Sequence, residues 1–90
     1  MWKLEYSTQF KKDLKKIKHQ PSKLQALKDV LIRLEQHGTV GSTHKPHMLS
    51  GEFSGCMECH IQNDFLLIWL DKETQTIKLI RTGTHSELFK

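Results

Sequence analysis

One apolar run, residues 65–70, most strongly limits what this chain can fold into. All six positions are hydrophobic, and turn-forming polar residues stand on both sides, Asn63-Asp64 before the run and Asp71 after it. A strand without a polar face is covered on both sides, as in the middle of a sheet. The run therefore predicts a central strand around which the other elements pack.

Hydrophobic spacing places the remaining elements. Residues 2–6, 57–61 and 76–82 read as strands, and a short edge strand is expected near 47–49. Two helices are expected early, one capped by Ser7 or Thr8 and one beginning at Pro21 and ending at Gly38. This order predicts an α+β fold in one domain, residues 1–90: an antiparallel sheet of four to five strands with two N-terminal helices packed on one face.

Length and composition set the general class. A chain of 90 residues forms one modest core, and 37% hydrophobic with 27% charged residues is typical of a folded globular protein. No apolar run approaches the ~20 residues that span a bilayer. The charged, alternating N-terminus is a poor signal peptide, so we expect a cytoplasmic protein without membrane contact.

Charge is distributed unevenly along the chain. The first 33 residues hold nine Lys or Arg and three acids, whereas the rest holds five and seven. Four lysines of the first helix are candidates for RNA contact: Lys11, Lys12, Lys15 and Lys16. Such a cluster is either a solvated helix face or a footprint for a polyanion, and charge alone leaves both readings open.

The segment Cys56-Met-Glu-Cys59-His60 matches the pattern of covalent haem attachment, but it falls where a strand is expected. Residues three apart on a strand point to opposite faces, so the two thiols should diverge. The same geometry argues against a redox pair and against a zinc site drawn from His44, His47 and the two cysteines. We therefore expect two free cysteines, no metal and no cofactor.

Several residues able to move protons fall beside strand ends. His47, His60 and His85 lie close in sequence to Asp64 or Arg81. Imidazole is the side chain best suited to proton transfer near neutral pH. Arg81 shares the parity of Ile77 and Leu79 on the last expected strand, so it is either a snorkelling margin residue or a bidentate phosphate clamp.

These residues carry a family resemblance over essentially the full length. The chain resembles the YafQ branch of the RelE-like bacterial toxins, which are ribosome-dependent messenger-RNA endonucleases of type II toxin–antitoxin systems. The segments that carry the resemblance are His47-Met-Leu-Ser-Gly51, Glu58-Cys-His-Ile61, Asp64 through Trp69, and Arg81 through Phe89.

The resemblance implies a metal-independent active site made of His47, His60, Asp64, Arg81, His85 and Phe89. His85 would be the general acid, Asp64 or His60 the base, and Arg81 would stabilise the phosphorane. His47 would position the phosphate and Phe89 would stack on a base. Phe65 stands where the family often has tryptophan and is a further candidate for RNA contact.

The implied partners are messenger RNA on the ribosome and a cognate antitoxin, expected to be a ribbon-helix-helix dimer through which alone operator DNA is contacted. Other classes remain open. A non-catalytic RNA- or ribosome-binding module explains the basic first half equally well, and it differs by tolerating loss of His85. A purely structural partner protein explains the helices and sheet but leaves the polar residues without a role.

Overall fold

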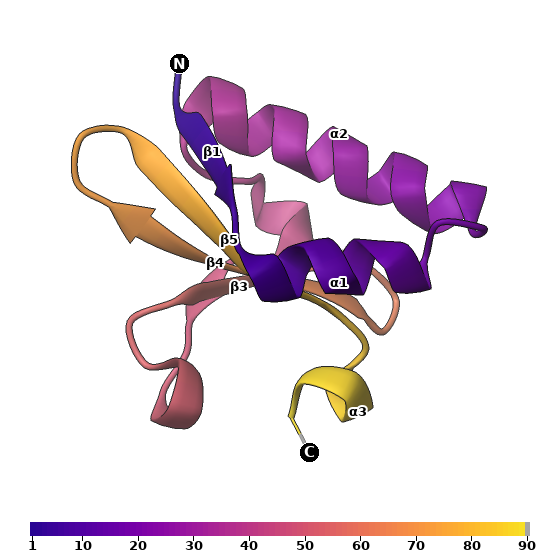
Figure 1. Ribbon diagram of the computed structural model, residues 1–90. Helices are drawn as coiled ribbons and strands as arrows, with labels where there is room; N and C mark the ends of the chain where they lie inside the picture. The colour runs from indigo at the N-terminus through magenta and orange to yellow at the C-terminus, as the bar shows by residue number, and fades with distance from the viewer. Residues whose placement is uncertain (90) are drawn as a thin grey trace.

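The computed structural model describes residues 1–89, which form three α-helices and a five-stranded sheet. The strand order is β1-β5-β4-β3-β2 (Figure 1). In chain order the elements are β1 (Lys3–Tyr6), α1 (Thr8–Lys16), α2 (Pro21–His37), β2 (His47–Met48), β3 (Met57–Gln62), β4 (Phe65–Lys72), β5 (Thr76–Gly83) and α3 (His85–Leu88). The predicted α+β class is confirmed, with β2 as the short edge strand.

Both long helices begin where the sequence predicted, and α2 also ends at the predicted residue. The Ser7 hydroxyl accepts the backbone N–H of Phe10 at the start of α1. Pro21 opens α2, and Gly38 ends it in the left-handed conformation with φ 72°. A Cβ at Gly38 would lie 2.5 Å from the Trp2 ring, so only glycine fits there.

The sheet carries a core on each face. The larger core lies under α1 and α2 and includes Phe10, Leu34, Cys59 and Trp69. The smaller core lies on the opposite face, where Leu88 of α3 covers Leu66 and Ile68 of β4, and Cys56 belongs to it. Figure 1 shows α3 on the side of the sheet away from α1 and α2. β4 is thus covered on both faces as predicted, and the two thiols lie on opposite sides.

Two features of the sheet differ from expectation. β1 pairs with β5 in parallel, so the sheet is mixed rather than wholly antiparallel. The register between β5 and β4 also contains a bulge. Leu79 pairs with Trp69 and Arg81 pairs with Ile68, so Ile80 is an extra residue without a partner in β4. This bulge reverses the parity of the strand beyond Leu79.

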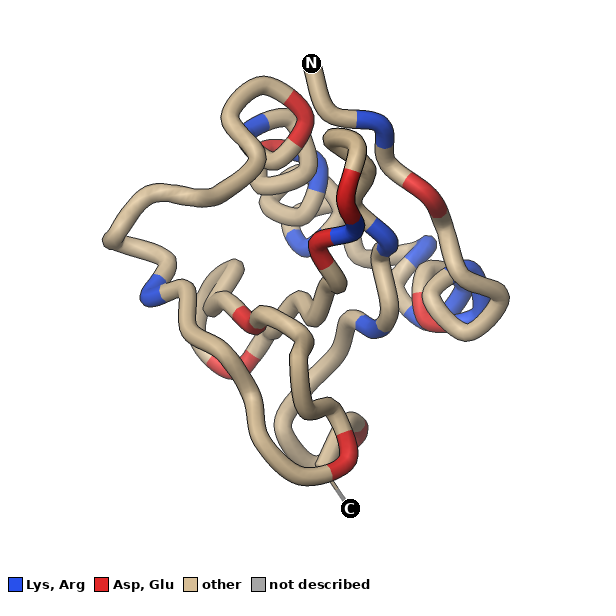
Figure 2. The backbone as a smooth tube through the Cα atoms, turned by 90° about the vertical axis from the view of Figure 1, so that its left-hand side faces the viewer, with Lys and Arg blue, Asp and Glu red and all other residues tan. Residues whose placement is uncertain are grey.

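The described residues contain no helix that is both long enough and apolar enough to cross a membrane. Positive charge is concentrated on the two long helices (Figure 2), with Lys11, Lys12, Lys15 and Lys16 all exposed on α1. The face of α1 turned toward the sheet carries Phe10 and, unexpectedly, the buried Asp13, and the buried Ile17 follows directly after the helix.

Candidate active site

Cross-strand register gathers the polar residues on the α3 side of the sheet. One row joins His47 of β2, Glu58 of β3, Ile68 of β4 and Arg81 of β5. The neighbouring pair is His60 and Leu66. Because residues opposite one another in antiparallel strands share a face, all of these lie on the face that α3 partly covers.

A line of aromatic rings crosses this face. The centroids of His47 and His60 are 6.5 Å apart, and those of His60 and His85 are 6.1 Å apart. His85 is 6.0 Å from Phe89, which meets Phe53 edge-on at 5.7 Å. Four predicted site residues therefore come together, and Phe53, from the 3₁₀ turn Gly51–Phe53, joins them from a loop that the sequence left without a role.

The shortest contact in the cluster joins His85 to Asp64. The Nδ1 of His85 lies 2.6 Å from Oδ1 of Asp64, and the same oxygen accepts the backbone N–H of His85 at 3.0 Å. These bonds, the backbone one first, lower the pKa of the Asp64 carboxyl. A carboxylate can only accept, so Nδ1 carries a proton and Nε2 is the nitrogen left to exchange protons.

α3 holds His85 in this place. Its N-terminus is closed by a capping box, in which the Thr84 hydroxyl accepts the Glu87 N–H and the Glu87 carboxylate accepts the Thr84 N–H at 2.8 Å. No element was predicted here from the sequence. The Thr84-x-x-Glu87 spacing is the signal that could have predicted the helix.

His47 is paired with a buried carboxylate that was not predicted from the sequence. Its Nδ1 donates to the carbonyl oxygen of Lys45 at 3.0 Å, and its Nε2 lies 3.2 Å from Oε1 of Glu58. The Glu58 side chain is only 4% exposed, and within residues 1–89 its Oε2 has no partner. Because Nδ1 already donates, the contact with Glu58 requires one shared proton, either on Nε2 or on the carboxyl group.

His44 holds the backbone of the site. Its Nδ1 donates to the carbonyl oxygen of His60 at 2.8 Å, from the turn Ser42–His44. The sequence offered His44 only as a zinc ligand. In the described part of the chain, no three His, Cys, Asp or Glu side chains are grouped to hold a metal ion.

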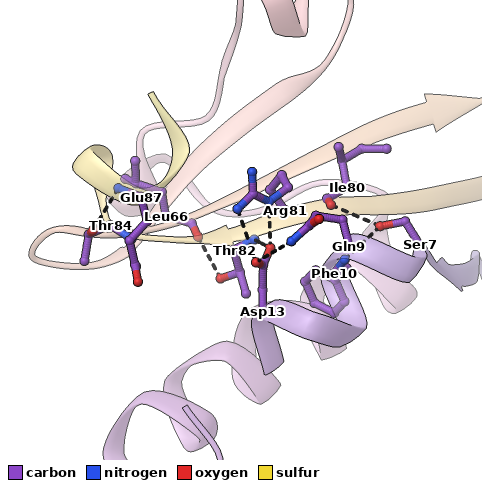
Figure 3. A network of polar contacts seen from close by, with 10 residues as sticks. All are labelled: Ser7, Gln9, Phe10, Asp13, Leu66, Ile80, Arg81, Thr82, Thr84 and Glu87. Atoms are coloured by element: carbon purple, nitrogen blue, oxygen red, sulfur yellow. Dashed lines mark hydrogen bonds and ion pairs between the residues drawn. The ribbon is translucent and has the colours of Figure 1, made fainter. Parts of the chain in front are cut away.

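Arg81 lies apart from the ring cluster. The bulge at Ile80 turns it away from the face of Ile77 and Leu79, so the predicted parity is wrong. Its guanidinium instead binds Asp13 of α1, with Nε 2.8 Å and Nη2 3.2 Å from the two carboxylate oxygens (Figure 3). Arg81 lines a cleft of about 380 Å³ between α1 and α3.

The predicted RNA-contact residues divide into two groups. Lys16 lines the same cleft as Arg81, whereas Lys11, Lys12 and Lys15 are exposed elsewhere on α1. The prediction that Phe65 contacts RNA is wrong. Its side chain lies in the core under the helices, where it is 2% exposed and cannot stack on RNA. The Lys23 ammonium lies over the Phe65 ring, 5.2 Å from the ring centroid.

Comparison with known proteins identifies relatives over the whole chain. Residues 2–90 match the family model described as the bacterial toxin of type II toxin-antitoxin system, YafQ. The mRNA interferase toxin YafQ of Escherichia coli K12 is 30% identical over 87 residues, covering 96% of this chain and 94% of that protein.

Two solved structures are similar throughout. A chain in the E. coli DinJ-YafQ toxin-antitoxin complex is 29% identical with a TM-score of 0.85, covering 99% of this chain and 98% of that one. A metal-bound toxin from Helicobacter pylori is 36% identical with a TM-score of 0.85, covering 99% and 100%.

Proposed function

The chain belongs to the YafQ family of bacterial toxins from type II toxin–antitoxin systems, and we propose that it is a ribosome-dependent endoribonuclease that cleaves messenger RNA and so inhibits translation. The observation that carries the proposal is the pair Asp64–His85 placed beside His60. This arrangement supplies an oriented acid and a second imidazole on one open face of the sheet.

His85 is the general acid. Asp64 receives its Nδ1–H and stabilises the imidazolium form, as a carboxylate does for histidine in other acid–base pairs. The Nε2 proton is then free to pass to the 5′-oxygen that leaves the phosphorus. Asp64 is thereby assigned as the orienting group rather than the base.

His60 is the general base. It takes the proton from a ribose 2′-hydroxyl, the 2′-oxygen attacks the adjacent phosphorus, and the bond from phosphorus to the 5′-oxygen breaks. The products are a 2′,3′-cyclic phosphate and a 5′-hydroxyl end. The bond from His44 to the His60 carbonyl keeps this strand end in place.

The remaining site residues bind the RNA. His47, paired with Glu58, contacts the phosphate, and Phe89 stacks on a base while Phe53 supports the edge of its ring. Arg81 supplies a guanidinium for phosphate at the cleft beside α3, with Lys16 near it. The ribosome supplies the positioning that a small open site lacks.

The reaction we propose needs no metal, because imidazoles move both protons and cations offset the phosphorane charge. The H. pylori relative is a metal-bound toxin, so the role of metal calls for a direct test. The toxin chain, dialysed against EDTA before it is added to the assay, should cleave ribosome-bound messenger at the rate of the untreated chain. Activity that is lost on this dialysis and returns only when the chain is reloaded with a metal ion would overturn the metal-free mechanism.

The partner we propose is a cognate acidic antitoxin, a ribbon-helix-helix dimer that alone contacts operator DNA. The support is the E. coli relative solved in complex with its antitoxin and the positive charge on α1 and α2. Co-expression with the adjacent reading frame should yield a stable complex, and recovery of the free chain alone would contradict this.

The deciding experiment compares cleavage of ribosome-bound and naked messenger by the parent and by His85→Ala. We expect cleavage on the ribosome by the parent and loss of cleavage in the variant. If His85→Ala still inhibits translation as the parent does, the chain is a ribosome-binding module and not a nuclease.

A further inference from the structure

Asp13 is a buried acid in a lysine-rich helix. It is 2% exposed, three residues after Phe10 and four before Ile17, on the face of α1 that packs against the sheet. The site residues implied by the sequence do not include it.

The Asp13 carboxylate is held by donors from three places (Figure 3). Its Oδ2 accepts the backbone N–H of Thr82 at 3.1 Å as well as Arg81 Nε, and its Oδ1 accepts Gln9 Nε2 at 3.3 Å as well as Arg81 Nη2. Four donors match the roughly four lone-pair sites of a carboxylate. Its orientation is therefore fixed by the sheet and the helix together.

α1 is fixed to β5 at this point. β1 pairs with β5 only as far as Leu79, and beyond this residue α1 lies along the edge of β5. There the Ser7 hydroxyl donates to the Ile80 carbonyl oxygen at 3.0 Å, and the Asp13 carboxylate accepts the backbone N–H of Thr82. Asp13 thus occupies a place that a strand would otherwise fill. A well-packed apolar pair serves stability as well as a buried ion pair does, so stability alone is a weak reason for a charge here.

The pair leaves one edge of the guanidinium free. Asp13 engages Nε and one N–H of Nη2, and within residues 1–89 the other three N–H groups have no protein acceptor. Because the guanidinium is planar, the Nη1 end points away from Asp13. Arg81 lines the cleft between α1 and α3 together with Gln9, Lys16, Glu52, Glu87 and Leu88.

We propose that Asp13 is a positioning residue that holds Arg81 so that its free edge meets an RNA phosphate in this cleft. The inference rests on the proposed nuclease function. Asp13 lowers the local positive charge, so it weakens plain attraction for RNA while it fixes direction. If Asp13 acts by positioning Arg81, removing its charge should slow cleavage. If only electrostatic attraction for RNA matters, removing its charge should speed cleavage.

The first test is Asp13→Asn, with Asp29→Asn as the matched control because Asp29 is an exposed acid on α2 bound only to Gln25 among the described residues. If Asp13 positions Arg81, kcat on ribosome-bound messenger should fall by ~10–10²-fold, the scale of a small misplacement. RNA affinity should hold or rise, because the variant has lost a negative charge. Faster or parental cleavage by folded Asp13→Asn overturns the inference.

A double variant shows whether Asp13 acts through Arg81. In an Arg81→Lys background, adding Asp13→Asn should change cleavage less than twofold, because the planar guanidinium that Asp13 orients is already gone. A further loss as large as in the parent background would show a role independent of Arg81. If the parent itself does not cleave in this assay, the proposed function fails, and the Asp13–Arg81 pairing is still tested by the next measurement.

NMR on the parent protein does not depend on whether an Asp13 or Arg81 variant folds. The chain has two arginines, Arg33 and Arg81, and Arg33 is exposed, so the two Nε–H signals are assigned with Arg33→Lys. The Arg81 signal should be protected from exchange and should persist when RNA with a 2′-deoxy cleavage site binds. Exchange as fast as that of Arg33, or loss of protection on binding, contradicts the proposal.

Discussion

Two ion pairs, Asp64–His85 beside α3 and Asp13–Arg81 between α1 and β5, differ mainly in burial. The Asp64 and His85 side chains are 58% and 55% exposed, whereas those of Asp13 and Arg81 are 1% and 19% exposed. An exposed pair contributes little to stability, but its proton is accessible to a substrate. A buried pair cannot lose one partner without leaving a charge in the interior. The exposed pair is therefore suited to proton transfer, and the buried pair is suited to holding side chains in a fixed orientation.

The largest expected effect is at the exposed pair. His85→Gln should lower messenger cleavage by ~10²–10⁴-fold because it removes the acid, while the thermal midpoint stays close to that of the parent. His19→Gln, an exposed histidine after α1, is the control and should behave as the parent does. A large loss of stability in His85→Gln would erase the contrast between the two pairs.

The next effect is at the buried pair, where activity and stability should fall together. Arg81→Ala leaves the Asp13 carboxylate uncompensated, and breaking such a pair costs ~3–5 kcal/mol of unfolding free energy. Urea unfolding measures this, with the exposed Arg33→Ala as control. A change below ~1 kcal/mol would mean that the Asp13–Arg81 pair behaves like a surface pair.

A third change acts between the two pairs. Gly83 has φ 155°, and an added Cβ would lie 2.8 Å from Glu87 Oε1 and 3.4 Å from the Leu88 side chain. Gly83→Ala should displace Glu87 from the Thr84 N–H, weaken α3 by ~0.5–2 kcal/mol and reduce cleavage by disturbing His85. Gly41→Ala meets nothing closer than 3.7 Å and should be neutral. Parental cleavage by Gly83→Ala would show that α3 need not hold its position.

The smallest effect is the pH dependence of stability at Asp64. Its pKa is lowered by the hydrogen bonds from His85, the backbone bond first, so its contribution is fully present above the unfolded value of ~3.9 and is lost as pH falls through the lower folded pKa. Asp64→Asn should remove this part of the acid-induced decrease in thermal midpoint. If parent and variant decline equally, the Asp64–His85 bond contributes nothing to folding.

Local sequence accounted for most of the elements. The Ser7 cap, Pro21 and Gly38 set the helix ends, and the apolar run at 65–70 gave the central strand. The spacing of Cys56 and Cys59 correctly placed the thiols on opposite faces. These features depend on residues close together in the chain, where spacing alone decides the geometry.

Some predictions failed where distant contacts override spacing. Phe65 was expected at the RNA surface, but its strand places it under the helices. The parity of Arg81 was wrong because a bulge at Ile80 inserts one residue between paired positions. Asp13 and Glu58 were missed because a buried acid is recognised only through its partner, although the position of Asp13 three residues after Phe10 was a sign.

The sequence by itself determined the order of the elements as far as β5, the two faces of the central strand and, by family resemblance, the residue types for acid–base chemistry. The tertiary structure decided that β1 joins β5 in parallel, that Asp64 bonds His85, and that Asp13 holds Arg81 across 68 positions of the chain. The physical reason is that register between strands and the burial of a charge depend on contacts between distant segments. Hydrophobic periodicity reports only which side of its own element a residue occupies.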